Sequence, residues 1–150
     1  MKLTYGSIRP LLIDELCLLP AQRQYRLVVV KPYVYEENDK KIVIPSGFLT
    51  DGATGIPDIG KSWLFHDYLY SSHQYTSGQK CTRKEADALM CKIAEYEGWK
   101  PLSVVCRAFF SFNIFYVATY AWRNSRKDGP EFLQDYSREL FETRILPHLK

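Results

Sequence analysis

Apolar and polar residues alternate in the first third of the chain in a pattern typical of β-strands. Residues 26–30 form a run rich in β-branched valine, Pro32 interrupts it, and residues 33–35 resume the pattern. The polar segment 36–40 has the composition of a turn, and residues 42–44 supply a short returning strand. Strand-forming runs joined by such a turn predict a β-hairpin.

The pattern changes to a helical period in the middle of the chain. Residues 51–60 carry three glycines and a proline and predict a loop, whereas residues 63–70 place rings and leucines at helical spacing. Thr82 and Glu85 then form a capping box, in which each side chain can bond the backbone beside the other. An apolar stripe follows, and Gly98 is suited to end the helix.

Two further helices are predicted in the last third of the chain. Pro101 suits the first turn of a helix, and residues 102–122 are mostly apolar. Polar residues interrupt this stretch and its rings lie in the middle, so we expect a central core helix rather than a membrane span. A last helix is expected from Pro130. Its inward-facing residues are expected to be Phe132, Leu133, Tyr136 and Leu140.

Strands followed by helices predict an α+β protein. We expect an N-terminal β-hairpin or small antiparallel sheet packed on a C-terminal bundle of about four helices. The segment 11–19 is apolar but short, and it fits either a strand or a helical turn. A length of 150 residues fits a single domain, whose motif-bearing core spans about residues 42–122.

Composition excludes several classes of protein. The chain is 46% hydrophobic and 25% charged, which is typical of a globular protein. A formal charge of +3 spread over mixed-sign segments does not favour nucleic acid. The four cysteines form no CxxC pair, and residues 1–10 lack the features of an export signal. We therefore expect free, buried thiols and a location in the cytoplasm of a host cell or in a virion.

Three separate segments carry the candidate chemistry, namely residues 47–54, 66–70 and 83–87. His66 and Tyr70 are four residues apart, so they share one face of their predicted helix. That helix is otherwise aromatic and aliphatic, and a buried polar group without a partner costs about 1–3 kcal/mol. We therefore expect the acids and Arg83 of the other segments to fold against it.

His66 and the acidic residues in these segments can be interpreted as chemical groups, and two of the acids also have a purely structural interpretation. His66 could deprotonate water, and Asp67 could bind a cation or orient a partner. Asp87 could accept a hydrogen bond from Tyr70 or His66, but an Asp in a first turn is also favoured by the helix dipole. Asp51 ends a strand before a glycine-rich loop, as functional carboxylates often do, or it forms a plain Asp-Gly turn.

The remaining polar residues near these segments have smaller expected roles. Thr50 could orient the Asp51 carboxylate or cap the loop. Arg83 is a further expected partner for the acids, and Asp67 with Asp51 is the expected metal-ligand pair for calcium or zinc. His73 and His148 are expected to be exposed and to take no part.

At these motifs the chain resembles an uncharacterised family carried by bacteriophages and bacteria. The family pattern is Gly-Phe-x-Thr-Asp-x-Ala-Ser/Thr, then His-Asp-x-x-Tyr/Leu, then Arg-x-x-Ala-Asp, and it corresponds here to residues 47–54, 66–70 and 83–87. The resemblance covers about residues 42–122. It implies a phage or prophage origin, with other phage proteins as partners, and it does not supply a reaction.

A second, local resemblance does suggest a reaction. His-Asp-x-x-Tyr followed by a helix with Ala-Asp is similar to the calcium-dependent secreted phospholipases and the parvoviral phospholipase domain. This resemblance implies His66 as the base, Asp67 as a calcium ligand, and Tyr70 with Asp87 as supports of the imidazole. The chain departs from those enzymes because it lacks their calcium-loop pattern and their disulfide framework.

Three functional hypotheses follow from the sequence. The first is a small hydrolase of esters or amides, with or without a metal ion, that has His66, Asp67 and Asp87 in its catalytic site. The second is a phage virion or assembly component in which the same polar cluster only joins a loop to helices. The third is a host-interaction or counter-defence protein. An enzyme needs His66 at a solvent-connected site, whereas a structural cluster needs it sealed.

Overall fold

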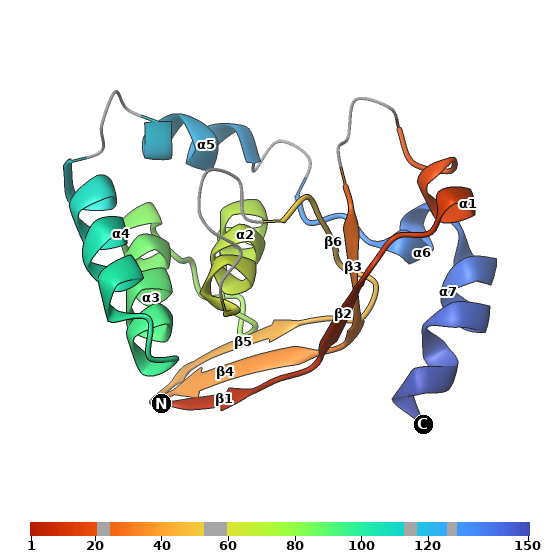
Figure 1. Cartoon of the computed structure of the whole chain (residues 1–150), viewed down its shortest axis with the longest axis horizontal. Coiled ribbons are helices and arrows are strands. Elements are labelled where there is room, and N and C mark those ends of the chain that lie inside the picture. The colour runs from red at the N-terminus through yellow and green to blue at the C-terminus, as the bar shows by residue number, and fades with distance from the viewer. Residues whose placement is uncertain (21–24, 53–59, 113–116, 126–128) are drawn as a thin grey trace. The chain divides into compact units, whose positions relative to one another are not determined.

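The chain folds into two compact units in the computed structural model, which describes residues 1–20, 25–52, 60–112, 117–125 and 129–150. The first unit comprises Met1–Thr54 with Pro130–Lys150, and the second comprises Gly55–Gly129. The first holds all the described strands and the second is helical (Figure 1). The predicted α+β class is confirmed. That the whole chain is a single domain stays a prediction.

The first unit contains two three-stranded antiparallel sheets. One has the order β1-β4-β5, with strands Lys2–Thr4, Tyr33–Glu37 and Lys40–Ile44. The other has the order β2-β3-β6, with strands Ser7–Pro10, Leu27–Lys31 and Leu49–Thr50. The predicted hairpin is β4–β5, in which Tyr33 pairs with Ile44 and Glu37 with Lys40. Its turn contains Asn38, whose φ of 55° lies in the left-handed region.

Two residues divide one long hairpin between the two sheets. Pro32 separates β3 from β4, as its missing backbone donor predicts, and Gly6 separates β1 from β2. The chains pass so closely here that a Cβ on Gly6 would lie 1.9 Å from the Lys31 carbonyl oxygen. A glycine at this position therefore allows the close approach of the two backbones.

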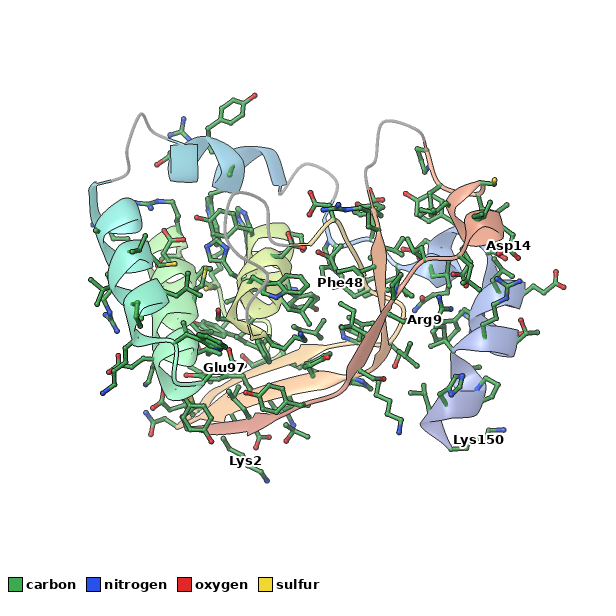
Figure 2. All side chains as sticks on the ribbon, viewed as in Figure 1. Lys2, Arg9, Asp14, Phe48, Glu97 and Lys150 are labelled. Carbon is green, nitrogen blue, oxygen red and sulfur yellow. The ribbon has the colours of Figure 1, made fainter. Side chains whose placement is uncertain are left out.

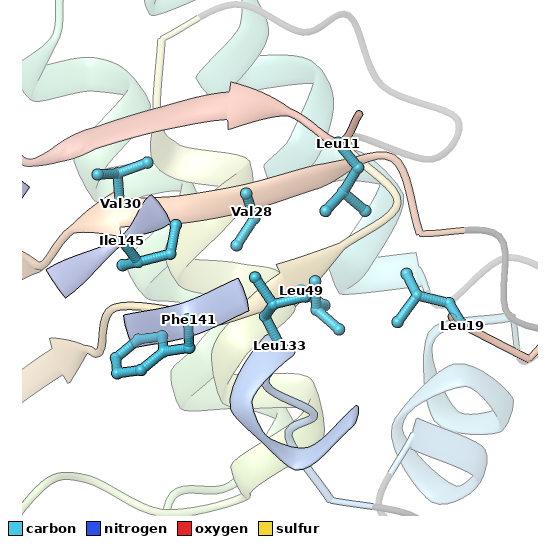
Figure 3. Packing of buried hydrophobic residues seen from close by; sticks show 8 residues of the cluster. All are labelled: Leu11, Leu19, Val28, Val30, Leu49, Leu133, Phe141 and Ile145. Atoms are coloured by element: carbon cyan, nitrogen blue, oxygen red, sulfur yellow. The ribbon is translucent and has the colours of Figure 1, made fainter. Parts of the chain in front are cut away.

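The core of the first unit lies where β3 and β6 meet three short helical segments near the C-terminus. These are α6 (Leu133–Tyr136), α7 (Arg138–Arg144) and the 3-10 turn η2 (Leu146–Leu149). Figure 3 shows the Phe141 and Ile145 side chains close to Val28 and Val30 of β3. The complete buried cluster comprises Leu11, Leu19, Val28, Val30, Leu49, Leu133, Phe141 and Ile145.

The prediction of one last helix from Pro130 is wrong in its start and its continuity. The first helical residue is Leu133, and the extended backbone of Ser137 separates α6 from α7. The Ser137 hydroxyl accepts a hydrogen bond from the Leu140 backbone N–H and caps α7. Of the predicted inward residues, Leu133 is fully buried, and Tyr136 with Leu140 packs against the cluster.

A buried carboxylate links the short helix α1 (Ile13–Leu16) to its neighbours in the first unit. Glu15 is fully buried and accepts two hydrogen bonds of 2.8 Å from the Arg9 guanidinium. It also accepts one from the Leu12 backbone and lies 3.3 Å from Arg144 of α7. Figure 2 labels Arg9 on β2 and Asp14 on α1, which pairs with the same Arg144. The apolar segment 11–19 thus forms a helical turn rather than a strand.

The second unit contains four described helices. They are α2 (Ser62–Ser72), α3 (Arg83–Tyr96), α4 (Lys100–Phe112) and α5 (Val117–Ser125). The predicted capping box starts α3, because the Thr82 hydroxyl accepts from the Glu85 backbone while Glu85 accepts from the Thr82 backbone. Gly98, with φ of 90°, follows the end of α3 as predicted.

The apolar stretch 102–122, predicted to be one core helix, is described as the end of α4 and the start of α5. α4 ends at Phe112 and α5 begins at Val117, and residues 113–116 lie outside the described part of the chain. Val104 and Val105 of α4 are strongly exposed, at 67% and 65%. Among the described residues, the helices are all too short or too polar to cross a bilayer.

The four cysteines are free thiols. Cys81, Cys91 and Cys106 are buried in the second unit, as expected, but Cys17 is exposed, contrary to the prediction. Cys17 ends the short helix α1, where a four-residue helix covers too little of the chain to bury both its faces.

Candidate functional site

The candidate site lies between α2 and α3. A carboxylate near the end of α3 bonds the start of α2 and so fixes the two helices relative to each other. Glu97, just after α3, accepts hydrogen bonds from the backbone N–H groups of Lys61 and Ser62 at 3.0–3.2 Å. These are unsatisfied donors at the start of α2, so Glu97 serves as its cap. The two helices pack along their lengths. This arrangement brings the middle of α2 to the first turns of α3.

Asp87 is the centre of the polar cluster between these helices. It lies on α3 among the buried residues Ala86, Met90 and Cys91, and only 4% of its side chain is exposed. Its Oδ1 accepts a 2.6 Å hydrogen bond from the Tyr70 hydroxyl and lies 2.8 Å from His66 Nε2. Its Oδ2 accepts a 2.7 Å bond from Arg83. Both carboxylate oxygens are therefore occupied by donors, as a buried charge requires.

The protonation of the His66 ring follows from what Asp87 can accept. An ionised carboxylate has no proton to donate, so His66 Nε2 must carry the hydrogen that lies between them. In the neutral imidazole the lone pair is then on Nδ1. The carboxylate thus selects the tautomer and fixes the plane of the ring.

Tyr70 supports this arrangement in two ways. Its ring lies against that of His66, with centroids 4.2 Å apart, because the two residues are one helical turn apart on α2. Burial, and then the hydrogen bond to the Asp87 carboxylate, raises the pKa of the Tyr70 phenol. The phenol therefore stays protonated at neutral pH and acts only as a donor to Asp87.

Arg83 and Asp87 are four residues apart on α3 and form an ion pair across one turn. The guanidinium is largely buried, so the pair is less screened by water than an exposed pair would be. His66 is 15% exposed at its side chain, which makes it one of the more accessible members of the cluster. The cluster is therefore neither fully sealed nor open.

The structure brings together four of the seven residues that the sequence singled out, and they are His66, Tyr70, Arg83 and Asp87. Asp67 is half-buried on α2. Thr50 and Asp51 belong to the first unit, where the Thr50 hydroxyl accepts from the Gly52 backbone N–H at 3.1 Å. Their grouping with His66, and a metal site shared by Asp67 and Asp51, stay predictions.

His73 is a residue that the sequence interpretation placed wrongly. It was expected to be exposed, but it is only 9% exposed and its ring lies flat on that of Trp122, with centroids 3.6 Å apart. Trp122 also meets the Tyr70 ring edge-on at 5.0 Å. A contact between residues 73 and 122 has no local sequence pattern, because it depends on how α5 packs on α2. His148 is exposed, as expected.

Comparison with known proteins gives one match. A family model described as a protein of unknown function (DUF1353) matches residues 27–105, which is more than half of the 150-residue chain. The match includes every one of the seven candidate site residues. No curated protein and no solved structure gives a significant match.

Proposed function

The chain belongs to the family of proteins of unknown function called DUF1353, and we propose that it is a small hydrolase in which His66 activates water. Asp87 would orient the imidazole, and Tyr70 with Arg83 would hold Asp87. The reaction class is hydrolysis of an ester or amide. The observation that carries this proposal is the triple coordination of the Asp87 carboxylate, with His66 Nε2 as one of the three donors.

A carboxylate that accepts from an imidazole is the usual way to prepare a histidine as a general base. With the hydrogen on Nε2, the Nδ1 lone pair can take a proton from a water molecule. The resulting hydroxide attacks the carbonyl carbon, and the imidazolium returns the proton to the leaving alcohol or amine. The buried charge of Asp87 stabilises the imidazolium that forms between these two steps.

The order of residues supports the same proposal through the local resemblance to phospholipases. In that pattern the histidine, the tyrosine one turn later and an aspartate of the next helix occupy the positions of His66, Tyr70 and Asp87. A cation at Asp67 would stabilise the oxyanion there. Among the described residues, no group of three or more His, Cys, Asp or Glu is placed to hold a metal ion. The calcium part of the proposal therefore rests on the resemblance, and zinc rests only on the ligand chemistry of the Asp67 and Asp51 carboxylates.

A structural role for the same cluster is the second candidate. It is favoured by the low exposure of Asp87 and by the saturation of its oxygens with donors from α2 and α3. In that case the cluster joins two helices of a phage virion or assembly component, or of a host-interaction protein. The two candidates differ in what the loss of His66 would do to stability.

The test compares His66→Ala and Asp87→Asn with the unchanged protein and with His148→Ala as the matched control. His148 is an exposed histidine in the first unit. Hydrolysis is followed with 4-nitrophenyl esters of short and long acyl chains and with phospholipid vesicles, each with calcium or with a chelator. Loss of a general base lowers a rate by about 10²–10⁴-fold, so we expect losses of that size in both site variants.

Stability is measured on the same variants by thermal unfolding. For a catalytic His66 we expect His66→Ala to keep a melting temperature close to that of the unchanged protein, with hydrolysis lost. If the wild-type protein hydrolyses none of these substrates and His66→Ala unfolds at a much lower temperature, the hydrolase is wrong and the structural role stands. Hydrolysis that survives His66→Ala would also contradict the proposal.

A further inference from the structure

His73 has an unusual backbone and an unusual position in the second unit. It follows the last residue of α2 and has φ of 58°, in the left-handed region that glycine and asparagine adopt more readily. Its side chain is nevertheless buried, and its Nε2 lies 2.9 Å from the Trp122 carbonyl oxygen of α5. A non-glycine residue in the left-handed region, with its side chain buried, points to a role for that side chain.

The His73 side chain packs against Trp122. The imidazole and indole rings are stacked, with centroids 3.6 Å apart and planes 18° apart. Together with the contact to the carbonyl oxygen, this stack attaches the backbone and the side chain of one α5 residue to the end of α2. His73 thus sets the position of Trp122 along α2.

Trp122 in turn contacts the candidate site. Its indole meets the Tyr70 ring at 5.0 Å with the planes 89° apart, the edge-to-face geometry that aromatic pairs favour. The same Tyr70 donates its hydroxyl to Asp87 and lies against His66. A continuous series of contacts therefore runs from His73 through Trp122, Tyr70 and Asp87 to His66.

We propose that His73 and Trp122 are positioning residues for His66. The indole limits the rotation of the Tyr70 ring, Tyr70 keeps its hydroxyl on Asp87 Oδ1, and Asp87 fixes the imidazole. Neither His73 nor Trp122 would touch the substrate. The catalytic consequence rests on the proposed hydrolase, but the geometric consequence can be measured without any substrate.

The test replaces Trp122 with leucine, which removes the ring, and with phenylalanine, which keeps one. Tyr120→Leu is the matched control, because Tyr120 lies two residues away on the same helix and is 73% exposed. A misplacement of about 1 Å can cost as much as about 10²-fold in rate. We expect Trp122→Leu to lower kcat about tenfold with KM changed less than about twofold. Trp122→Phe should recover kcat to within about threefold of wild type.

The second readout is the nitrogen-bound proton of the His66 ring in nitrogen-edited NMR spectra. The chain has only three histidines, so their signals can be assigned by single substitutions. The proton between His66 Nε2 and Asp87 should exchange slowly in the wild-type protein. We expect its exchange to be about tenfold faster in Trp122→Leu and unchanged in Tyr120→Leu. His73→Asn tolerates the same backbone, lacks the ring, and should act in the same direction.

These readouts separate the two proposals. Faster proton exchange in Trp122→Leu and His73→Asn, together with no hydrolysis by the wild-type protein, would support the positioning role and contradict the proposal of a hydrolase. Unchanged exchange would overturn the positioning role, whatever the effect on kcat. Should Trp122→Leu fail to fold, His73→Asn provides the same test, because faster exchange of the His66 ring proton is expected there and unchanged exchange would overturn the positioning role.

Discussion

Asp87 illustrates how a charged residue can lie in an apolar interface between two helices. The carboxylate is nearly inaccessible to water, and an isolated charge in such a place would be strongly unfavourable. Three donors compensate the loss of water, and one of them carries a full positive charge. This full coordination makes Asp87 a fixed reference for the His66 ring, whether the ring works in catalysis or in packing.

Gly6 gives a prediction at the scale of a single residue. A methyl group there would meet the carbonyl oxygens of Lys31 and Pro32 at 1.9 and 2.3 Å, and both are backbone atoms that cannot rotate away. We expect Gly6→Ala to lower the free energy of unfolding by more than about 3 kcal/mol, because the two chains must separate. Urea denaturation followed by circular dichroism measures this loss.

Gly78→Ala is the control for this substitution. Apart from its chain neighbours, no atom of the described residues lies within 4 Å of a Cβ at Gly78, so only its φ of 91° opposes a side chain. We expect a loss of about 1 kcal/mol there. Equal losses at the two positions would contradict the role given to the close approach of the two strands at Gly6.

Among the elements of the first unit, Glu15 connects β2 and α1, which follow one another in sequence, with the distant α7. Burial by itself would raise the pKa of Glu15, but the Arg9 hydrogen bonds and the Leu12 backbone N–H outweigh it. The net result is a pKa below the ordinary value of 4.5. Glu15 therefore binds its proton less readily in the folded state than in the unfolded state.

The sign of the pH dependence follows from this lowered pKa. The contribution of Glu15 to stability is complete above its ordinary value of 4.5 and is lost as the pH falls through the folded value. We expect Glu15→Gln to lower the free energy of unfolding by about 2 kcal/mol at about pH 7, and by much less at about pH 3. Urea denaturation at both pH values measures the difference.

Glu142→Gln is the matched substitution on the surface. Glu142 pairs with Arg138 one turn away on α7, and both side chains are exposed. Exposed pairs of this kind contribute at most about 0.5 kcal/mol, so little change is expected at either pH. A loss for Glu15→Gln that stays constant from neutral to acid pH would contradict the role given to its charge.

At the scale of the whole molecule, the reactivity of the cysteine thiols can be used to measure how readily the folded protein opens. Cys17 is exposed in the first unit, and the other three cysteines are buried in the second. Burial, and then the neighbouring Cys106, raises the pKa of the Cys91 thiol to about 11, and burial raises the pKa of Cys106 as well. Thiols in this state contain very little reactive thiolate at neutral pH.

We therefore expect one thiol of the four to react rapidly with a disulfide reagent in the native protein. The remaining three should react only when the second unit opens, at a rate that increases with urea. Cys17→Ser should remove the rapid phase and leave the slow phase unchanged. A native protein in which two or more thiols react rapidly would contradict the burial of Cys81, Cys91 and Cys106.

Local patterns predicted several elements correctly. The break at Pro32, the β4–β5 hairpin and the capping box of α3 each depend on residues close in sequence, so composition and spacing suffice to predict them. The contact of Asp87 with His66 was foreseen because a polar residue in an apolar helix needs a partner nearby. The strong exposure of Val104 and Val105 on α4 was not predicted, since an apolar composition by itself indicates burial.

The amino-acid sequence alone was sufficient to predict the α+β fold class and the main local elements. It also indicated which acidic and basic residues to consider for a site. These features depend on neighbours along the chain. The folded chain was needed to place Trp122 on His73, to set Gly6 against Lys31 and to bring both oxygens of Asp87 to three donors. Such contacts join residues far apart in sequence. They arise when whole helices and strands pack to bury apolar surface, a process that leaves no local pattern to read.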